Sequence, residues 1–363
     1  MATAASIRSA QPSKTMGEFD LIQRFFTRPT PRAVLGVGDD CALLQPAPAM
    51  QQAISTDMLV SGRHFFPDVD PYALGHKALA VNLSDLAACG ASPVAFTLAL
   101  ALPDANPAWL ESFSQGLLAL ADAHGCELIG GDTTQGPLNI CITVFGEVPH
   151  GQALLRSGAR AGDDVYVSGS LGEASLALAQ LLRQRQDQDQ DRSAETQMPA
   201  PVAQLNAADL ALARQRLEQP TPRLALGTAL RGIATAAADI SDGLLGDLGH
   251  ILERSRVGAS LETALALGLL PRQRYSATAA AQLASAALRP TVLQHVLSGG
   301  DDYELVFTAA PEQRAAVQAA AHSSQTPVTR IGQIDAEPGL RLYEPDGSLL
   351  QHQFASFDHF AGG

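Results

Sequence analysis

The chain has 363 residues, which is long enough for two domains that each bury a hydrophobic core. Hydrophobic residues make up 46% of it and charged residues only 17%, which excludes a largely disordered chain. The formal net charge of −13 argues against a nucleic-acid backbone or an anionic membrane as the main partner. No apolar run approaches about 18 residues and no signal-peptide core is visible, so we expect no membrane span and a cytoplasmic location.

Strand and helix signals alternate in an expected N-terminal α/β domain at 16–150, after a polar start (1–15) that we expect to be disordered. Asp70 before Pro71 and Asn106 before Pro107 are helix-start signals. In chain order we expect a strand at 51–56, a helix at 71–90, a strand at 94–102, a helix at 106–124, a short strand ending at a glycine pair, and a strand at 138–148.

A second α/β domain is expected at 151–363. Residues 184–206 are polar and of low complexity, and we expect a disordered surface insertion there, at about 184–206. Both halves mix strands and helices, so the predicted fold class is α/β (α+β-like) with two domains. The expected elements are a strand at 162–169, a helix from about 171, helices near 208–217 and 222–232, a strand at 236–241, a helix at 242–255, a strand at 303–309, a helix at 311–322, and strands at 328–334 and 339–344.

The cysteines are widely spaced and form no CxxC pair or Cys/His metal motif. Each stands in an apolar context, so we expect small buried side chains in a reducing compartment. They are Cys41, Cys89, Cys126 and Cys141.

Aspartates recur at the ends of apolar runs, each beside glycine, serine, threonine or another aspartate. A carboxylate that ends a buried run needs a counter-charge, and Mg²⁺ can lie among several carboxylates and also bind a phosphate. Two carboxylates about 4 Å apart repel by roughly 4 kcal/mol at an effective dielectric near 20, so convergence of four or five would require divalent ions. These residues are Asp39 and Asp40 in GVGDD, Asp57 in ISTD, Asp85 in NLSD, Asp132 in IGGDT, and Asp239 and Asp242 in ADISD.

The segment ISTDMLVSGRHF presents Ser55, Thr56 and Asp57 in succession, and oxygen ligands of this kind suit Mg²⁺. Arg63 and His64 follow on a loop, where a substrate phosphate is within reach. A helix cap or an Asx turn at 55–57 is the structural alternative, and an ordinary loop histidine is the alternative for His64.

The other acidic motifs also have structural alternatives. Asn82 and Asp85 share one face of the predicted helix, which could be a solvated surface face. IGGDT could be a hairpin turn, and ADISD a helix-capping motif. Adjacent Asp39 and Asp40 would point to opposite sides of an extended chain, so we expect only one of them to enter a site.

Several enzyme classes are excluded by missing motifs. The sequence has no GxxxxGK[ST] phosphate loop, no protein-kinase set of Gly-rich loop, HRD and DFG, and no GxSxG nucleophile elbow.

Taken together, these segments resemble the thiamine-monophosphate kinase family. They occur in the family's order and cover nearly all of residues 16–360. The motifs are GVGDDCALL, STDMLVSGRHF, NLSDLAACGASP, IGGDTT, RSGARAGDDVYVSGSLG, ADISDGLLGDL, SGGDDYELVF and FDHF.

The resemblance implies ATP-dependent phosphorylation of thiamine monophosphate (TMP) to thiamine diphosphate, by direct transfer with several Mg²⁺ ions and with Asp57, Asp85 and Asp132 as catalytic residues. It implies ATP contacts at Gly131, Asp132, Arg156 and Ser241, and thiamine contacts at His64, Asp301 and Phe357. The implied metal ligands are Asp40, Ser55, Thr56, Asp57, Asp85, Asp132, Asp239 and Asp242.

The implied fold has an N-terminal domain whose strands pair with a second subunit to close a barrel, so a homodimer is expected. ATP would lie mainly on that domain. Two positions depart from the family pattern. Asp301 replaces the family's glutamate, which shortens the side chain by one methylene, and Phe357 replaces a tyrosine.

The expected mechanism is in-line attack by a monophosphate oxygen of TMP on the γ-phosphorus of ATP. A phosphate monoester is already nucleophilic at neutral pH, so no general base is required. The alternatives are a related ATP-dependent enzyme similar to aminoimidazole ribonucleotide synthetase, or a non-catalytic protein that binds nucleotides or thiamine phosphates.

Overall fold

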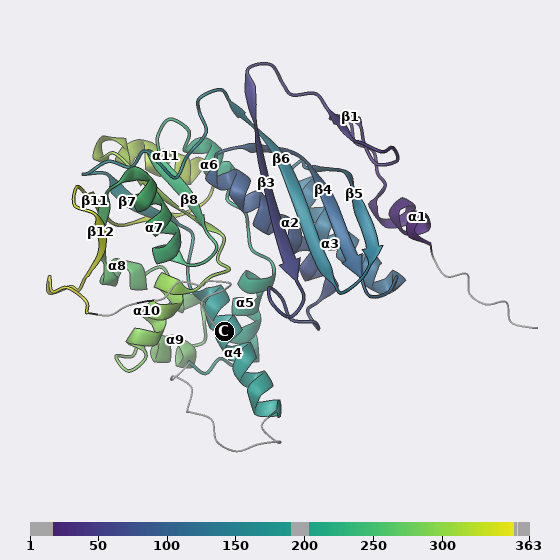
Figure 1. Cartoon of the computed structure of the whole chain (residues 1–363). Helices are drawn as coiled ribbons and strands as arrows, with labels where there is room; N and C mark the ends of the chain where they lie inside the picture. The colour runs from purple at the N-terminus through teal and green to yellow at the C-terminus, as the bar shows by residue number, and fades with distance from the viewer. Residues whose placement is uncertain (1–16, 190–202, 352–353, 355–363) are drawn as a thin grey trace, which may run out of the picture.

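The computed structural model describes residues 17–189, 203–351 and 354. Two sheets, each with its own helices, lie side by side, the N-terminal sheet on the right and the C-terminal sheet on the left of Figure 1. One hydrophobic cluster spans both halves, whereas a second one belongs to the C-terminal half. None of the helices in the described part of the chain has the length and apolar character that a membrane crossing needs.

The N-terminal sheet has four strands in the order β3-β6-β4-β5. Strands β4 and β5 run parallel, and the other neighbours are antiparallel. Helices α2 and α3 cover one face, while the face toward the viewer in Figure 1 carries no helix. The bounds are α1 (Glu18–Leu21), η1 (Ile22–Phe26), β1 (Ala33–Leu35), β2 (Leu43–Leu44), β3 (Met50–Val60), α2 (Pro71–Ala88), β4 (Ser92–Leu102), α3 (Pro107–Ala123), β5 (Glu127–Gln135) and β6 (Asn139–Pro149).

Both predicted helix starts are confirmed. The Asp70 side chain accepts a hydrogen bond from Ala73 N at 2.9 Å, and Asn106 accepts bonds from the first turn of α3. Helix α2 is buried on nearly every side, with Leu79 and Leu83 fully enclosed. The surface-helix alternative for this segment is therefore wrong.

Helices α2 and α3 approach each other closely because glycines face the contact. A Cβ atom on Gly75 would lie 2.0 Å from Phe113 O, and one on Gly116 would lie 1.9 Å from Tyr72 O. We expect Gly75→Ala to lower the free energy of unfolding by about 1–3 kcal/mol, because backbone would have to move. Gly249→Ala is the matched control, since a Cβ there meets nothing within 4 Å. Urea unfolding measures both, and equal stability of the two variants would contradict this packing.

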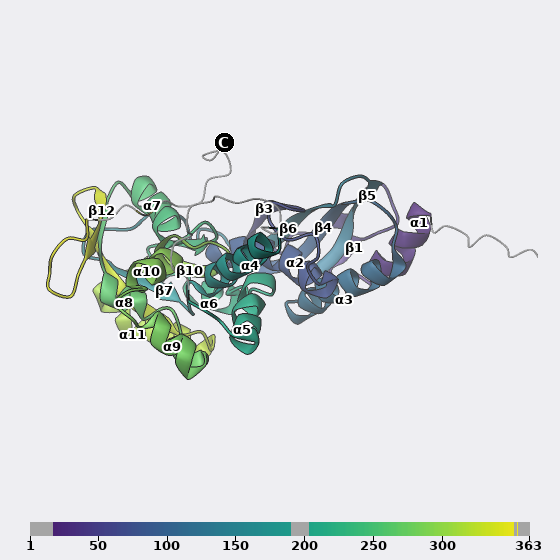
Figure 2. The same cartoon turned by 90° about the horizontal axis from the view of Figure 1, so that it is seen from below.

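The C-terminal half has a six-stranded sheet in the order β12-β9-β11-β7-β10-β8, with helices around it (Figure 2). Its strands are antiparallel except for the parallel pair β12 and β9. The bounds are β7 (Asp164–Ser168), α4 (Glu173–Asp189), α5 (Ala207–Glu218), α6 (Leu224–Ala229), β8 (Ala236–Ile240), α7 (Leu244–Ser255), β9 (Gly258–Glu262), α8 (Thr263–Leu267), η3 (Arg272–Arg274), α9 (Ala277–Leu283), α10 (Arg289–Ser298), β10 (Glu304–Ala309), η4 (Pro311–Gln313), α11 (Arg314–Ser323), β11 (Val328–Asp335) and β12 (Gly339–Tyr343).

Several sequence predictions need correction. The strand expected at 51–56 continues through Asp57 to Val60, and β5 continues through the glycine pair and Asp132. The segment expected as a solvated insertion begins as the end of α4, and Leu205 at its far side is buried. The polar start (1–15) and the middle of the insertion lie outside the described residues.

The cysteines are all free, but only Cys126 is buried, so the expectation of four buried thiols is wrong.

Candidate active site

Strand β3 presents Ser55 and Asp57 on the face that meets α2, because side chains alternate along a strand. Ser55 Oγ donates a hydrogen bond to Asp85 Oδ2 at 2.5 Å. The backbone N–H of Asp57 donates to Asn82 Oδ1 at 3.0 Å. The predicted pair Asn82 and Asp85 therefore faces β3 from α2, and both residues help to hold the strand.

The C-terminal half brings Asp239 and Asp242 to the same place. Asp239 lies near the end of β8, and its carboxylate accepts a hydrogen bond from Ser84 Oγ of α2 at 2.9 Å. Asp247 accepts bonds from the backbone N–H groups of Ser241 and Asp242 at 3.0 and 3.1 Å. Asp247 was not predicted, although its position in the motif ADISDGLLGDL was a possible signal.

A cavity of about 480 Å³ lies where these elements meet. Four predicted carboxylates line it together with His64, Ser241 and Asp301. They come from both halves of the chain and are Asp57, Asp85, Asp239 and Asp242.

A neighbouring cavity of about 440 Å³ shares Asp85 and Asp239 with the first. Ser55 and Arg156 line this second cavity. Of the predicted ATP contacts, Ser241 lines the first cavity and Arg156 lines the second. Asp85 and Asp239 line both cavities and so connect them.

The gathered carboxylates disturb one another's titration. Burial, followed by repulsion from Asp85 and Asp242, raises the pKa of Asp57 to about 6. Burial, then Asp85 and Asp247, raises the pKa of Asp239 to about 8. Burial also raises the pKa of Asp247 to about 7 and that of Asp85 above its usual range. Burial is the largest cause at each of these carboxyls, and the charge of Arg156 opposes the shifts of Asp85 and Asp247.

This gathering of buried carboxylates on one cavity fits a divalent cation. The hydrogen-bond donors to Asp85 and Asp239 are serine hydroxyls, and no salt bridge within the described ranges involves Asp57, Asp85 or Asp239. Oxygen ligands of this kind are those that Mg²⁺ prefers. Within the same ranges, however, no three His, Cys, Asp or Glu side chains are already arranged as a group that could hold a metal ion.

A small recess of about 200 Å³ adjoins the acidic cavity. His64 and Asp301 line both spaces, and Phe65 and Phe66 line the recess. The Arg185 guanidinium lies over the Phe66 ring, 4.1 Å from its centroid. His64 Nδ1 accepts a hydrogen bond from Val60 N at 3.0 Å, so the ring proton of the neutral form is on Nε2. The recess thus combines an apolar wall with polar groups at its border.

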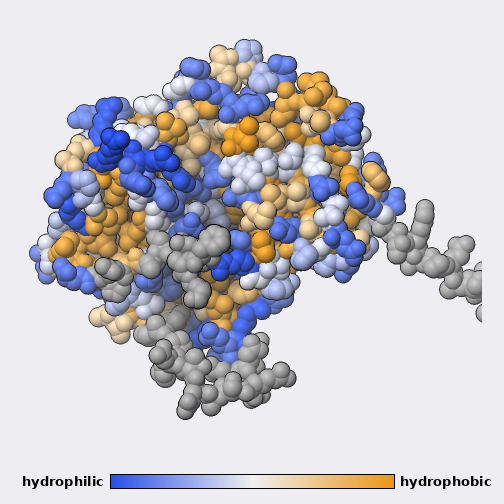
Figure 3. All heavy atoms as spheres, viewed as in Figure 1, coloured by the Kyte–Doolittle hydropathy of each residue, from blue (hydrophilic) through white to orange (hydrophobic). Residues whose placement is uncertain are grey.

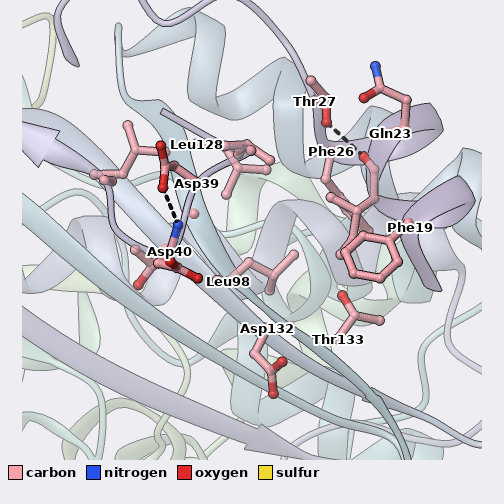
Figure 4. Close-up of a pocket in the computed structure, with 18 residues that line it drawn as sticks. Phe19, Gln23, Phe26, Thr27, Asp39, Asp40, Leu98, Leu128, Asp132 and Thr133 are labelled. Atoms are coloured by element: carbon pink, nitrogen blue, oxygen red, sulfur yellow. Dashed lines mark hydrogen bonds between the residues drawn. The ribbon is translucent and has the colours of Figure 1, made fainter. Parts of the chain in front are cut away.

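The remaining predicted ligands lie elsewhere. Asp40, Gly131 and Asp132 line a separate cavity of about 750 Å³, to which α1, η1, β4 and β5 also contribute residues. Figure 4 shows Asp39 and Asp40 on one side of this cavity and Asp132 below them. Both Asp39 and Asp40 line it, and the Asp39 carboxylate accepts a hydrogen bond from Asp40 N at 2.8 Å. That only one of the pair enters a functional site stays a prediction.

Thr56 points to the helix-free face of the sheet, where its Oγ1 lies 2.9 Å from Thr143 Oγ1. Its side chain therefore lies on the opposite face of β3 from the side chain of Asp57. Phe357 lies outside the described residues. In a single chain, the metal and ATP residues implied by the resemblance are thus divided between the inter-domain cavities and the cavity of Asp132.

Comparisons with known proteins cover most of the chain and agree with one another. The family model "AIR synthase related protein, N-terminal domain" matches residues 38–148, and the corresponding C-terminal model matches 160–344. Thiamine-monophosphate kinase of Escherichia coli K12 is 44% identical over 95% of this chain and 98% of its own length. That of Haemophilus influenzae is 41% identical, with the same coverage.

Solved structures give the same result. The crystal structure of thiamine-monophosphate kinase from Stenotrophomonas maltophilia K279a superposes with a TM-score of 0.76 at 44% identity, covering 93% of this chain and 99% of that one. AaThiL complexed with AMPPCP and TMP superposes with a TM-score of 0.67 at 26% identity, covering 87% and 89% of the two chains.

Proposed function

Because the chain belongs to the thiamine-monophosphate kinase family, within the AIR synthase related proteins, we propose that it transfers the γ-phosphoryl group of ATP to TMP and forms thiamine diphosphate and ADP. The observation that supports this most is the cavity in which Asp57, Asp85, Asp239 and Asp242 converge from two halves of the chain. The related AaThiL has been solved complexed with AMPPCP and TMP.

In this reaction a phosphate oxygen of TMP forms a bond to the γ-phosphorus, while the bond from that phosphorus to the β,γ-bridging oxygen breaks. Both reactants are anions, so the residues of the chain must align them and offset their repulsion. We assign Mg²⁺ binding to the carboxylates of the inter-domain cavity, with Ser55 beside them. The bound ions would add to the positive charge of Arg63 and Arg156, which line these cavities.

We assign each substrate to the cavity that its predicted contact residues line. ATP would be bound through Gly131 and Asp132 on β5 and through Arg156 and Ser241 near the domain junction. The organic part of TMP would be bound at the recess beside His64 and Asp301. Asp40, Thr56 and Phe357 stay in the proposal as metal or substrate contacts on the strength of the family motif.

A homodimer is also part of the proposal. Strand β3 is an edge strand of 11 residues, and Ile54 and Met58 on it are 58% and 53% exposed. Orange and pale residues lie over this helix-free sheet face in Figure 3. A long edge strand with an apolar face favours pairing with another chain. The four free cysteines support a reducing compartment such as the cytoplasm.

The proposal is tested by incubating the purified protein with ATP and TMP and separating the thiamine phosphates. We expect thiamine diphosphate and ADP in equal amounts with Mg²⁺, and a fall of at least about 10³-fold after chelation, because a metal contributes several kcal/mol. Thiamine diphosphate formation unchanged by chelation would contradict the metal assignment. ADP formed without thiamine diphosphate would favour a relative that acts on another substrate, and no turnover would favour a binding protein.

A further inference from the structure

Lys77 is a buried cation that reaches from the N-terminal half of the protein to the C-terminal half. It lies on α2, its side chain is 5% exposed, and its Nζ is 2.8 Å from Asp301 Oδ1. Only one other lysine occurs in the chain, Lys14. A desolvated ammonium group lowers stability unless a partner compensates it, so this cation depends on its contact with Asp301.

Asp301 is held in one orientation. Its backbone has a φ of +67°, in the left-handed region that aspartate tolerates better than most residues. Its Oδ1 accepts hydrogen bonds from Lys77 Nζ and, at 3.3 Å, from Tyr303 Oη. Both contacts use the same oxygen, so neither of them occupies Oδ2.

The ion pair stands at the border between two spaces. Asp301 lines both the acidic cavity and the recess, and Lys77 lines the recess. Arg63 also lines both spaces. Without Lys77, Asp301 would add a further negative charge to the cavity that Asp57 and Asp239 line, where an anionic phosphate has to enter. With Lys77, the border carries a fixed ion pair whose charges cancel.

We propose that Lys77 is a positioning residue for TMP, an inference that rests on the proposed function. Lys77 fixes Asp301 through Oδ1, so that Oδ2 accepts a hydrogen bond from an N–H group of the substrate's aminopyrimidine. The ring then lies against Phe65 and Phe66 in the recess, and the phosphate points into the acidic cavity.

The test is steady-state kinetics of Lys77→Met with each substrate varied in turn. We expect the KM for TMP to rise at least 10-fold, with the KM for ATP and kcat within threefold of wild type. Lys77→Arg keeps a donor, and we expect it to restore most of the loss. Lys77→Met combined with Asp301→Asn is expected to be no worse than the worse single variant, because both changes remove the same contact.

His76→Leu is the matched control. His76 precedes Lys77 on α2 and its Nε2 lies 2.9 Å from Pro220 O, a contact that links the same helix to the C-terminal half outside both spaces. A merely structural role of Lys77 predicts the same kinetic change in both variants, and that result would overturn the proposal. So would an unchanged KM for TMP in Lys77→Met, or an equal rise of the KM for ATP.

Asp301→Asn keeps the shape of the side chain and serves as the test if Lys77→Met does not fold. We expect it to raise the KM for TMP at least 10-fold while the KM for ATP stays within threefold, and no change in the KM for TMP would overturn the proposal. Absence of thiamine diphosphate formation by the wild-type protein would instead refute the proposed function itself.

Discussion

Replacing Asp57 or Asp85 by asparagine should lower kcat at least about 10³-fold, because each change removes a charged metal ligand worth several kcal/mol in the transition state. Each asparagine keeps the size of the carboxylate it replaces. The fold should therefore persist, which circular dichroism checks. Wild-type-like turnover in both variants would contradict the metal assignment.

In the metal-free protein, Asp57→Asn should not lower the free energy of unfolding. Burial, followed by repulsion from Asp85 and Asp242, raises the pKa of Asp57 to about 6 in the folded state, from an ordinary value of 3.8. An acid with a raised pKa costs stability progressively as the pH rises from its unfolded pKa through its folded pKa, so the full cost is present above about pH 6. Each pKa unit corresponds to about 1.4 kcal/mol, so Asp57→Asn should stabilise the metal-free protein by up to about 3 kcal/mol at pH 8. Thermal unfolding in a chelator measures this, and a lower Tm than wild type would be the contrary result.

The second large effect is expected at Glu304, which lies at the start of β10 and is fully buried. Its carboxylate accepts hydrogen bonds from Ser168 Oγ at 2.6 Å, Arg216 Nη2 at 2.9 Å and Arg223 Nε at 2.6 Å. Glu304→Ala leaves two largely buried guanidinium groups without this carboxylate. We expect it to lower the free energy of unfolding by about 3–5 kcal/mol.

Urea unfolding of Glu304→Ala should be compared with that of Arg24→Ala. Arg24 forms a 3.6 Å pair with Glu111, and both side chains are more than half exposed. Such surface pairs contribute at most about 1 kcal/mol, so Arg24→Ala should stay near wild type. If the two variants lost similar stability, the claim that the buried network around Glu304 stabilises the fold more than a surface ion pair would be contradicted.

Local signals in the sequence were sufficient for much of the fold. The capping residues Asp70 and Asn106 marked the starts of α2 and α3 correctly because a cap acts within one helical turn. The continuation of β3 through Asp57 was missed. At that position the edge strand's backbone N–H is satisfied by the Asn82 side chain, a contact between residues 25 positions apart. No local pattern encodes such a contact.

The candidate site was predictable in its residue types but not in its arrangement. The motifs identified Asp57, Asp85, Asp239 and Asp242, and the fold brings these four to one cavity. Asp40 and Asp132 stand in motifs of the same resemblance, yet they line a different cavity of the single chain. Lys77 carried no motif signal of its own, because its ion pair is formed with a residue 224 positions away.

The central claim is that divalent cations bound by carboxylates from both halves of the chain allow two anionic substrates to meet. The most direct measurement is a crystal structure with Mn²⁺, a non-hydrolysable ATP analogue and TMP, with data collected for anomalous scattering. We predict Mn²⁺ peaks in contact with Asp57, Asp85 and Asp239, between the two phosphate chains. Bound substrates with no peak at these carboxylates, or with peaks confined to the protein surface, would contradict the claim.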